Sequence, residues 1–117
     1  MPAILIVEDE AKMRRLLELN LGVDGFSTFS AEDAEAGLKM LRENPIDLVL
    51  TDLGMPVISG WEIAKRTKEK NPKTPVVMIT GWGAQYEDAE LSGRGVDLML
   101  AKPLSWDKLL NSIEKLL

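Results

Sequence analysis

The sequence predicts an α/β protein in which a parallel β-sheet carries helices on both faces. Short apolar runs and amphipathic segments alternate five times along the 117 residues, and this order is typical of strands joined by right-handed helical crossovers. The apolar runs are continuous, as expected of strands that are buried on both sides. The length suits one compact unit, so we expect a single domain over residues 1–117.

Composition and charge exclude several classes of function. The chain has no cysteine and no histidine, so disulfides, thiolate metal sites and imidazole chemistry are excluded. Its net charge of −5 disfavours direct binding to nucleic acid, which needs clustered Lys and Arg. No apolar run reaches the length of a membrane span, and the first residues lack the pattern of a signal peptide. We therefore expect no nucleic-acid or membrane partner and a cytoplasmic location.

The first two strand–helix units are expected within residues 3–44. Residues 3–7 form an apolar run with three β-branched residues, followed by the acidic triplet Glu8-Asp9-Glu10. A helix is expected over residues 12–21, ended by Gly22, with an apolar face of Met13, Leu16, Leu17 and Leu21. Residues 26–29 are expected to be a strand, and Ser30 to cap a helix that stops before Pro45. The apolar positions of that helix are Ala34, Leu38 and Leu41.

The remaining units follow the same order. A strand over residues 46–52 ends on Asp52, and a helix over 61–70 follows a loop. Strands are also expected over 75–80 and 96–101, separated by a polar helix over 84–92. Ser105 is expected to cap a last helix. That helix has an apolar stripe made of Leu109, Leu110, Ile113, Leu116 and Leu117.

Chemically active side chains stand where four of these strands end. The carboxyl ends of parallel strands share one edge of the sheet, which is where ligands bind in such folds. At about 5 Å and an effective dielectric of about 20, each pair of carboxylates costs roughly 3 kcal/mol in repulsion, which favours a hard divalent cation such as Mg²⁺. A Lys can hold an anionic oxygen, and a Thr offers a hydroxyl. The residues concerned are Glu8, Asp9, Asp52, Thr80 and Lys102.

Each of these residues also has a simpler explanation when taken alone. Glu8-Asp9 suits a solvated turn or the first turn of a helix, and Asp52 suits a cap. Thr80 at a strand end fits ordinary β-propensity, and Lys102 fits a solvent-exposed position. Their joint occurrence at one sheet edge favours a site for phosphoryl transfer, in which a carboxylate accepts the group and cations neutralise its charge.

Several motifs resemble the receiver domain of two-component response regulators over nearly the whole chain. They are the acidic pair after the first strand, Thr51-Asp52-Leu53-Gly54-Met55-Pro56 with Gly60, Met78-Ile79-Thr80-Gly81, and Lys102-Pro103. The resemblance implies a flavodoxin-like (βα)5 fold, with a doubly wound parallel sheet of strand order 2-1-3-4-5. It also implies a signalling phosphoacceptor that catalyses only its own phosphorylation and dephosphorylation.

The resemblance assigns roles to individual residues. Asp52 would become the aspartyl phosphate, and Lys102 would bind a phosphoryl oxygen. Asp9, Asp52 and the Gly54 carbonyl would bind Mg²⁺ directly, with Glu8 acting through water. Thr80 would move to the phosphoryl group, past the small Gly81. Pro103 would follow a cis bond.

The resemblance also implies partners. A sensor histidine kinase or a histidine phosphotransfer protein would donate the phosphoryl group, and a downstream output protein or domain would read it. A homodimer would form through the predicted elements 84–92, 96–101 and the last helix. The alternative is a degenerate receiver that binds partners without being phosphorylated. A flavodoxin and a dehalogenase-type phosphatase are disfavoured, because the acidic triplet suits neither.

One position departs from the family pattern. The family usually has Tyr or Phe three residues before the Lys as a switch coupled to the Thr, whereas Met99 stands there in this chain. Met is flexible and can fill a pocket without supplying a ring or a hydroxyl. Output is then expected through the fourth helix and its preceding loop. Trp82 either shields the phosphoryl group from water or anchors the loop, whereas Trp61 and Trp106 are expected to pack at helix starts.

Overall fold

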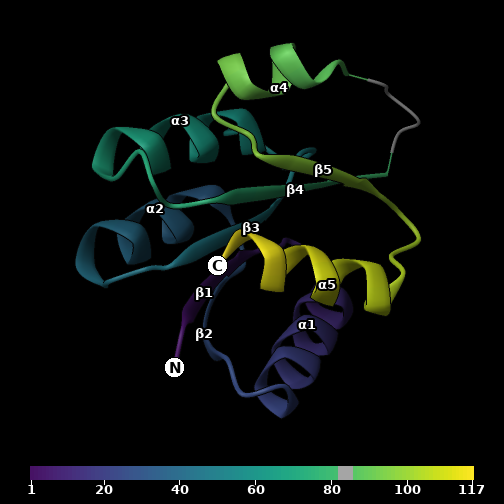
Figure 1. The fold of residues 1–117 in the computed structure, drawn as a ribbon. Coiled ribbons are helices and arrows are strands. Elements are labelled where there is room, and N and C mark those ends of the chain that lie inside the picture. Colours follow the sequence, from purple (N-terminus) through teal and green to yellow (C-terminus); the bar gives the residue numbers. More distant parts are fainter. Residues whose placement is uncertain (82–85) are drawn as a thin grey trace.

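The computed structural model of the chain describes residues 1–81 and 86–117. Its centre is a parallel sheet of five strands in the order β2-β1-β3-β4-β5 (Figure 1). The strands are β1 (Ala3–Val7), β2 (Ser27–Ala31), β3 (Leu48–Asp52), β4 (Val76–Thr80) and β5 (Leu98–Ala101). The predicted doubly wound sheet and its strand order are therefore confirmed.

The helices cover both faces of this sheet (Figure 1). One face packs against α1 (Ala11–Val23) and α5 (Trp106–Leu116). The other face packs against α2 (Ala34–Glu43), α3 (Gly60–Lys70) and α4 (Asp88–Gly93). Among the described helices, none is both long and apolar enough to cross a membrane.

The two halves of the core are built by alternate residues of the same strands. In β1, Ile4 and Ile6 face α1 and α5, whereas Leu5 and Val7 face α2 and α3. All five residues of β3 and of β4 are buried. Continuous apolar runs satisfy this two-sided burial, because successive side chains of a strand point to opposite faces.

Helix α1 differs from the prediction at its end and on its inner face. It continues through Gly22 to Val23, and the chain turns at Gly25, whose φ of +91° suits glycine. The buried residues of the helix are Leu17 and Leu21, one turn apart, and the predicted Met13 is half-buried against the same core. Leu16 was expected on that face but is 56% exposed, because the side of the helix that faces the sheet is centred on Leu17 and Leu21.

The expected cap at Ser30 is wrong. Strand β2 pairs with β1 as far as Ala31 opposite Val7, so Ser30 lies inside the strand. Helix α2 is capped instead by Asp33, whose Oδ1 accepts a hydrogen bond of 2.7 Å from the Ala36 backbone amide. The strand extends beyond its apolar residues because the parallel pairing holds it.

Helices α4 and α5 follow the expected pattern only in part. Helix α4 was expected from residue 84, but Tyr86 and Glu87 precede it and it begins at Asp88. Ser105 caps α5 as expected, with its Oγ accepting from the Lys108 amide at 3.4 Å. The buried residues of α5 are Leu109 and Ile113, whereas the predicted stripe residue Leu117 is 45% exposed.

Candidate functional site

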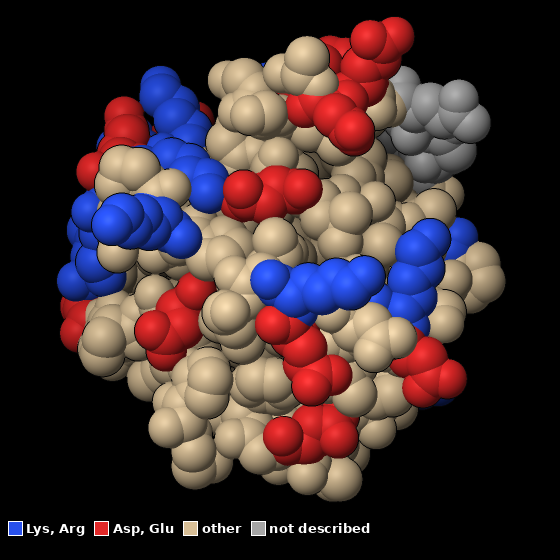
Figure 2. All heavy atoms as spheres, in the orientation of Figure 1, with Lys and Arg blue, Asp and Glu red and all other residues tan. Residues whose placement is uncertain are grey.

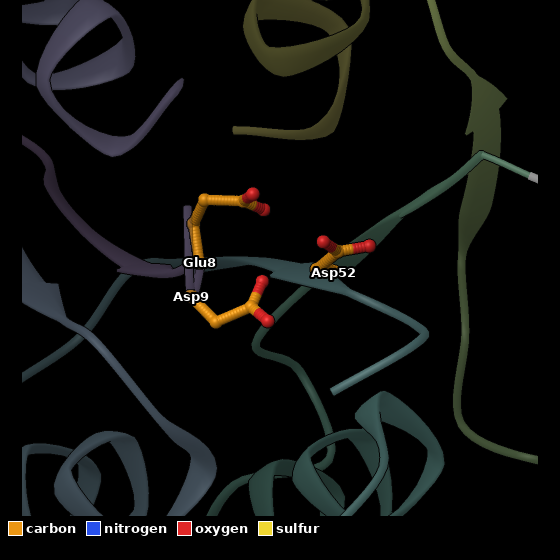
Figure 3. A group of neighbouring side chains, drawn as sticks. All are labelled: Glu8, Asp9 and Asp52. Atoms are coloured by element: carbon orange, nitrogen blue, oxygen red, sulfur yellow. The ribbon is translucent and has the colours of Figure 1, made fainter. Parts of the chain in front are cut away.

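Three carboxylates meet at the carboxyl ends of β1 and β3. Glu8 and Asp9 directly follow β1, and Asp52 is the last residue of β3. Each contributes an oxygen to a group whose atoms all lie within 4.8 Å of one another. Figure 3 shows the side chains of Glu8, Asp9 and Asp52 pointing toward a common space. The predicted acidic cluster therefore exists in the structure.

The sheet register sets this meeting point. Val7 lies opposite Thr51 in the β1–β3 ladder, so the residues that follow, Glu8 and Asp52, are neighbours across the two strands. The backbone around Glu8 is fixed on both sides. Its amide donates to the Ala31 carbonyl at 3.1 Å, and its carbonyl accepts from Nη1 of Arg14 at 2.9 Å.

The carboxyl groups differ in exposure. Glu8 is only 1% exposed and Asp52 only 5%, whereas Asp9 is exposed to solvent. Neither carboxyl oxygen of Glu8 has a hydrogen-bond partner within the described parts of the chain. Burial raises the pKa of Glu8 from 4.5 to about 8, and the neighbouring Asp52 adds to this shift. Without a cation, Glu8 therefore holds a proton at neutral pH.

Lys102 closes the site from β5. Its Nζ donates to Asp52 Oδ2 at 3.2 Å and lies 3.8 Å from Glu8 Oε1. Partial burial acts to lower the pKa of Lys102, but the hydrogen bond to Asp52 and the nearby carboxyl groups outweigh it and raise the pKa above its ordinary value. The Lys102 backbone amide donates to the Thr80 carbonyl at 2.8 Å. The Lys102–Pro103 peptide bond is cis, as expected.

The site has the chemistry of a divalent-cation site. Its candidate ligands are oxygens only, which suits Mg²⁺ better than softer metals. Burying the two carboxyl oxygens of Glu8 without hydrogen-bond partners, as in the described chain, costs free energy. A bound cation would offset that cost. Gly54, the predicted backbone ligand, is exposed in the loop two residues after Asp52.

Thr80 and Gly81 lie beside this centre. Thr80 is the last residue of β4 and is buried, and β4 pairs with β3 so that Ile79 lies opposite Asp52. A methyl group added at Gly81 would meet Lys102 Cδ at 3.8 Å, which is ordinary contact. Thr80 also lines a cavity of about 380 Å³ together with Met99. The predicted residue Trp82 lies outside the described residues.

The loop after Asp52 is fixed by a close backbone contact. The Gly60 amide donates to the Leu53 carbonyl at 3.0 Å. A Cβ atom at Gly60 would lie 2.4 Å from the Asp52 carbonyl oxygen, so only glycine allows α3 to approach the end of β3 this closely. In the same loop Val57 has a φ of +69° and is fully exposed, a strained conformation for a β-branched residue.

A second cluster near the site was not found by sequence reasoning. Trp61 is half-buried and packs against the core, as expected, but its ring also contacts Tyr86 and Arg94. These residues flank α4 on either side. The sequence gave little reason to expect this cluster. Tyr86 is the only tyrosine of the chain, but no helical or strand spacing connects it to Trp61.

Comparison with known proteins finds relatives over nearly the whole chain. The family described as "Response regulator receiver domain" matches residues 4–114. The response regulator ArlR of Staphylococcus haemolyticus is 35% identical over 117 residues, which are 100% of this chain and 53% of that protein. The chain spans between 13% and 53% of the length of the curated relatives that it matches.

Solved structures of response regulators also resemble the chain over its full length. The response regulator TrrA of Thermotoga maritima, solved in complex with Mg²⁺-BeF, superposes with a TM-score of 0.88 at 32% identity and covers 100% of both chains. A structure of the histidine kinase ThkA in complex with TrrA matches with a TM-score of 0.87 at 32% identity, covering 100% of this chain and 99% of that one. The chain therefore has the same fold as TrrA and is similar to it in sequence.

Proposed function

The chain belongs to the family of response regulator receiver domains of two-component systems, and from this premise we propose that it accepts a phosphoryl group on Asp52. The observation that carries the proposal is the position of Asp52: its Oδ2 lies 3.2 Å from Lys102 Nζ and within the same oxygen cluster as Glu8 and Asp9. A carboxylate between an ammonium group and a candidate cation site is suited to take up a phosphoryl group. We propose that residues 1–117 act as a single receiver domain.

The reaction transfers one phosphoryl group from a phosphohistidine. An Asp52 carboxylate oxygen attacks phosphorus, an O–P bond forms, and the P–N bond to the donor imidazole breaks. The imidazole nitrogen keeps the electron pair and takes up a proton from solvent. Because residues 1–117 contain no histidine, the donor phosphohistidine lies outside them. Support for a kinase as donor comes from the complex of ThkA with the relative TrrA.

Two further residues act on the transferred group. Lys102 holds a phosphoryl oxygen, since its ammonium group already contacts the acceptor carboxylate. Thr80 donates its hydroxyl to another phosphoryl oxygen from the neighbouring strand end. These residues position the group and neutralise its charge, and such effects account for most of the catalysis in phosphoryl transfer.

The acidic cluster holds Mg²⁺ in this proposal. Asp9, Asp52 and the Gly54 carbonyl would bind the ion directly, and Glu8 would act through water. When bound, Mg²⁺ neutralises charge that develops on the phosphoryl oxygens. Support comes from the three converging carboxylates and from the Mg²⁺-BeF complex of TrrA.

Phosphorylation then changes the surface that partners read. Met99 lines the cavity beside Thr80 without supplying a ring, so we propose that output runs through α4 and its preceding loop toward a downstream protein or domain. Self-association through α4, β5 and α5 stays a prediction. A receiver that binds partners without phosphorylation is not favoured, because Asp52, Lys102 and the acidic pair are all present and close together.

Incubation with a small phosphodonor, read by intact mass, tests the proposal. The parent protein should gain the mass of one phosphoryl group with acetyl phosphate and Mg²⁺, and it should gain none with EDTA. Asp52→Asn should gain none under either condition, because its amide is a poor nucleophile. Asp47→Asn, which changes an exposed Asp at the opposite end of β3, is the matched control and should behave as the parent. An unmodified parent would overturn the proposal.

A further inference from the structure

Helix α4 is held to the rest of the molecule by few buried contacts. It has six residues, Asp88–Gly93, and only Leu91 among them is buried. Its N-cap residue Glu87 makes no side-chain capping bond, and the helix lies at the outer end of the fold (Figure 1). A helix this short is marginal without tertiary contacts, so its position depends on whatever holds its two ends.

A single side chain of α3 contacts both ends of α4. The guanidinium carbon of Arg94, the C-cap residue, lies 3.7 Å from the centre of the Trp61 ring. The ring of Tyr86, which precedes the helix, packs edge-to-face on Trp61 with centroids 5.3 Å apart and an interplanar angle of 78°. Both geometries are favourable contacts for an indole ring. We call Trp61, Tyr86 and Arg94 the Trp61 clamp.

The clamp is connected to the phosphoacceptor site through a cavity. Tyr86 lines the same space of about 380 Å³ as Thr80 and Met99, with Asp88 and Leu91 of α4 in its wall. A movement of Thr80 toward Asp52 would change the packing in this pocket, and Tyr86, which also lines it, would lie next to that change. The pocket opens to solvent and so leaves space for a side chain to move, whereas a close-packed core would resist such a movement.

The clamp is also part of the molecular surface. Trp61 and Arg94 line a groove of about 710 Å³ between α3 and the turn after α4. Figure 2 shows acidic side chains over α4 and basic side chains over the region of α2 and α3. A displacement of α4 therefore changes both the shape of this groove and the relative position of two oppositely charged surfaces.

We propose that the Trp61 clamp sets the position of α4 and that phosphorylation opens it. In the unphosphorylated protein Trp61 holds Tyr86 and Arg94 together and keeps α4 against the sheet. Phosphorylation draws Thr80 toward Asp52, Tyr86 leaves the Trp61 ring, and α4 becomes free to move. Trp61 is thus a positioning residue that acts through α4. This second step rests on the proposed function of Asp52, whereas the clamp in the unphosphorylated protein does not.

Hydrogen exchange of the α4 backbone amides tests the clamp without phosphorylation. Trp61→Leu should speed exchange at residues 88–93 about tenfold, because one aromatic pair and one cation–π contact are lost. Arg94→Gln, a change at an exposed residue, and Tyr86→Leu should each give a smaller rise. Tyr86→Phe should match the parent, because the ring alone makes the contact. The matched control is Trp106→Leu, which alters a half-buried Trp at the start of α5.

A second measurement separates this inference from the proposed function. Each protein is treated with acetyl phosphate and Mg²⁺ and followed by both intact mass and exchange. The parent should gain one phosphoryl group and exchange faster in α4, whereas Trp61→Leu should gain the same mass with no further rise. A phosphorylated parent with unchanged α4 exchange would overturn the opening step. Unchanged exchange in unphosphorylated Trp61→Leu and Arg94→Gln would overturn the clamp, and an unphosphorylated parent would overturn only the proposed function.

Discussion

Lys102 Nζ lies 3.2 Å from Asp52 Oδ2, although Asp52 ends β3 and Lys102 directly follows β5, which is not a neighbour of β3 in the sheet. Strand β4 separates β3 from β5, and the side chain of Lys102 reaches across its end. The same ammonium group lies 3.8 Å from Glu8 Oε1. One ammonium group therefore lies within 4 Å of two buried carboxyl groups, and it occupies the position at which a phosphoryl oxygen on Asp52 would need a partner.

Replacing Lys102 should slow phosphorylation and leave the fold intact. We expect Lys102→Gln to lower the rate of phosphorylation by acetyl phosphate about a hundredfold, the usual effect of removing one charge-stabilising donor. Mg²⁺ binding should persist or tighten, because a cation has been removed from beside the acidic cluster. Intact mass over time and Mg²⁺ titration measure the two effects. Lys115→Gln, an exposed change in α5, is the control; equal rates in both variants would exclude a role for Lys102.

The buried Glu8 predicts an unusual dependence of stability on pH. The pKa of Glu8 is raised from 4.5 to about 8 in the folded protein, chiefly by burial. Between these values the folded state binds one proton more than the unfolded state. Without metal, the free energy of unfolding should therefore fall as pH rises across this interval, by at most about 1.4 kcal/mol per pH unit. Urea unfolding in EDTA at several pH values measures this slope.

Two comparisons isolate the contribution of Glu8. Glu8→Gln should flatten the slope, since no proton is then exchanged, whereas the exposed-site variant Glu114→Gln should retain it. Mg²⁺ should restore stability at alkaline pH, and its affinity should rise with pH because binding displaces the Glu8 proton. A parent protein whose stability is level between about pH 5 and about pH 8 would contradict the buried, protonated Glu8.

Val57 predicts a stabilising substitution in the loop beside the site. Its φ of +69° is costly for a β-branched side chain, and the residue is fully exposed, so its side chain gains little from packing. We expect Val57→Gly to raise the free energy of unfolding by about 1 kcal/mol and the Tm by about 4 °C. The same change at Val23, an exposed residue at the end of α1, should be destabilising. Thermal melts of both variants decide the sign.

The sequence predicted where the site lies better than it predicted how deeply its side chains are buried. Asp52, Thr80 and Lys102 could be placed at one edge because parallel strands share the direction of their carboxyl ends. The neighbouring position of β1 and β3 came from the family resemblance, because alternation alone does not specify strand order. The burial of Glu8 was not predictable, since it depends on how Arg14 and the β1–β3 ladder hold the backbone.

Short sequence patterns also gave wrong or incomplete predictions at positions whose structure is determined by tertiary contacts. Ser30 had the residue type of a cap, but pairing with β1 keeps it in a strand, and Asp33 takes the capping role. Trp61 was expected only to pack. Its contacts with Tyr86 and Arg94 depend on the position of α4 relative to α3, and no short-range period in the sequence encodes that position.

Gly60 predicts a link between backbone packing and phosphorylation. A methyl group at this position would lie 2.4 Å from the Asp52 carbonyl oxygen, a distance that cannot be tolerated without moving α3 or the end of β3. Gly60→Ala should therefore destabilise the protein by about 1–3 kcal/mol, the usual cost of overpacking. It should also slow phosphorylation, because the displaced backbone carries Asp52.

The matched variant is Gly22→Ala, because both glycines lie in helices and both gain one methyl group. Apart from Gly22's chain neighbours and its own helix backbone, no atom of the described residues lies within 4 Å of the Cβ position there, so this variant should gain about 0.5–1 kcal/mol from higher helix propensity and phosphorylate as the parent. Urea unfolding and intact mass give both quantities for each variant. If Gly60→Ala were as stable as Gly22→Ala and equally fast in phosphorylation, the close approach of α3 to Asp52 would not constrain the site.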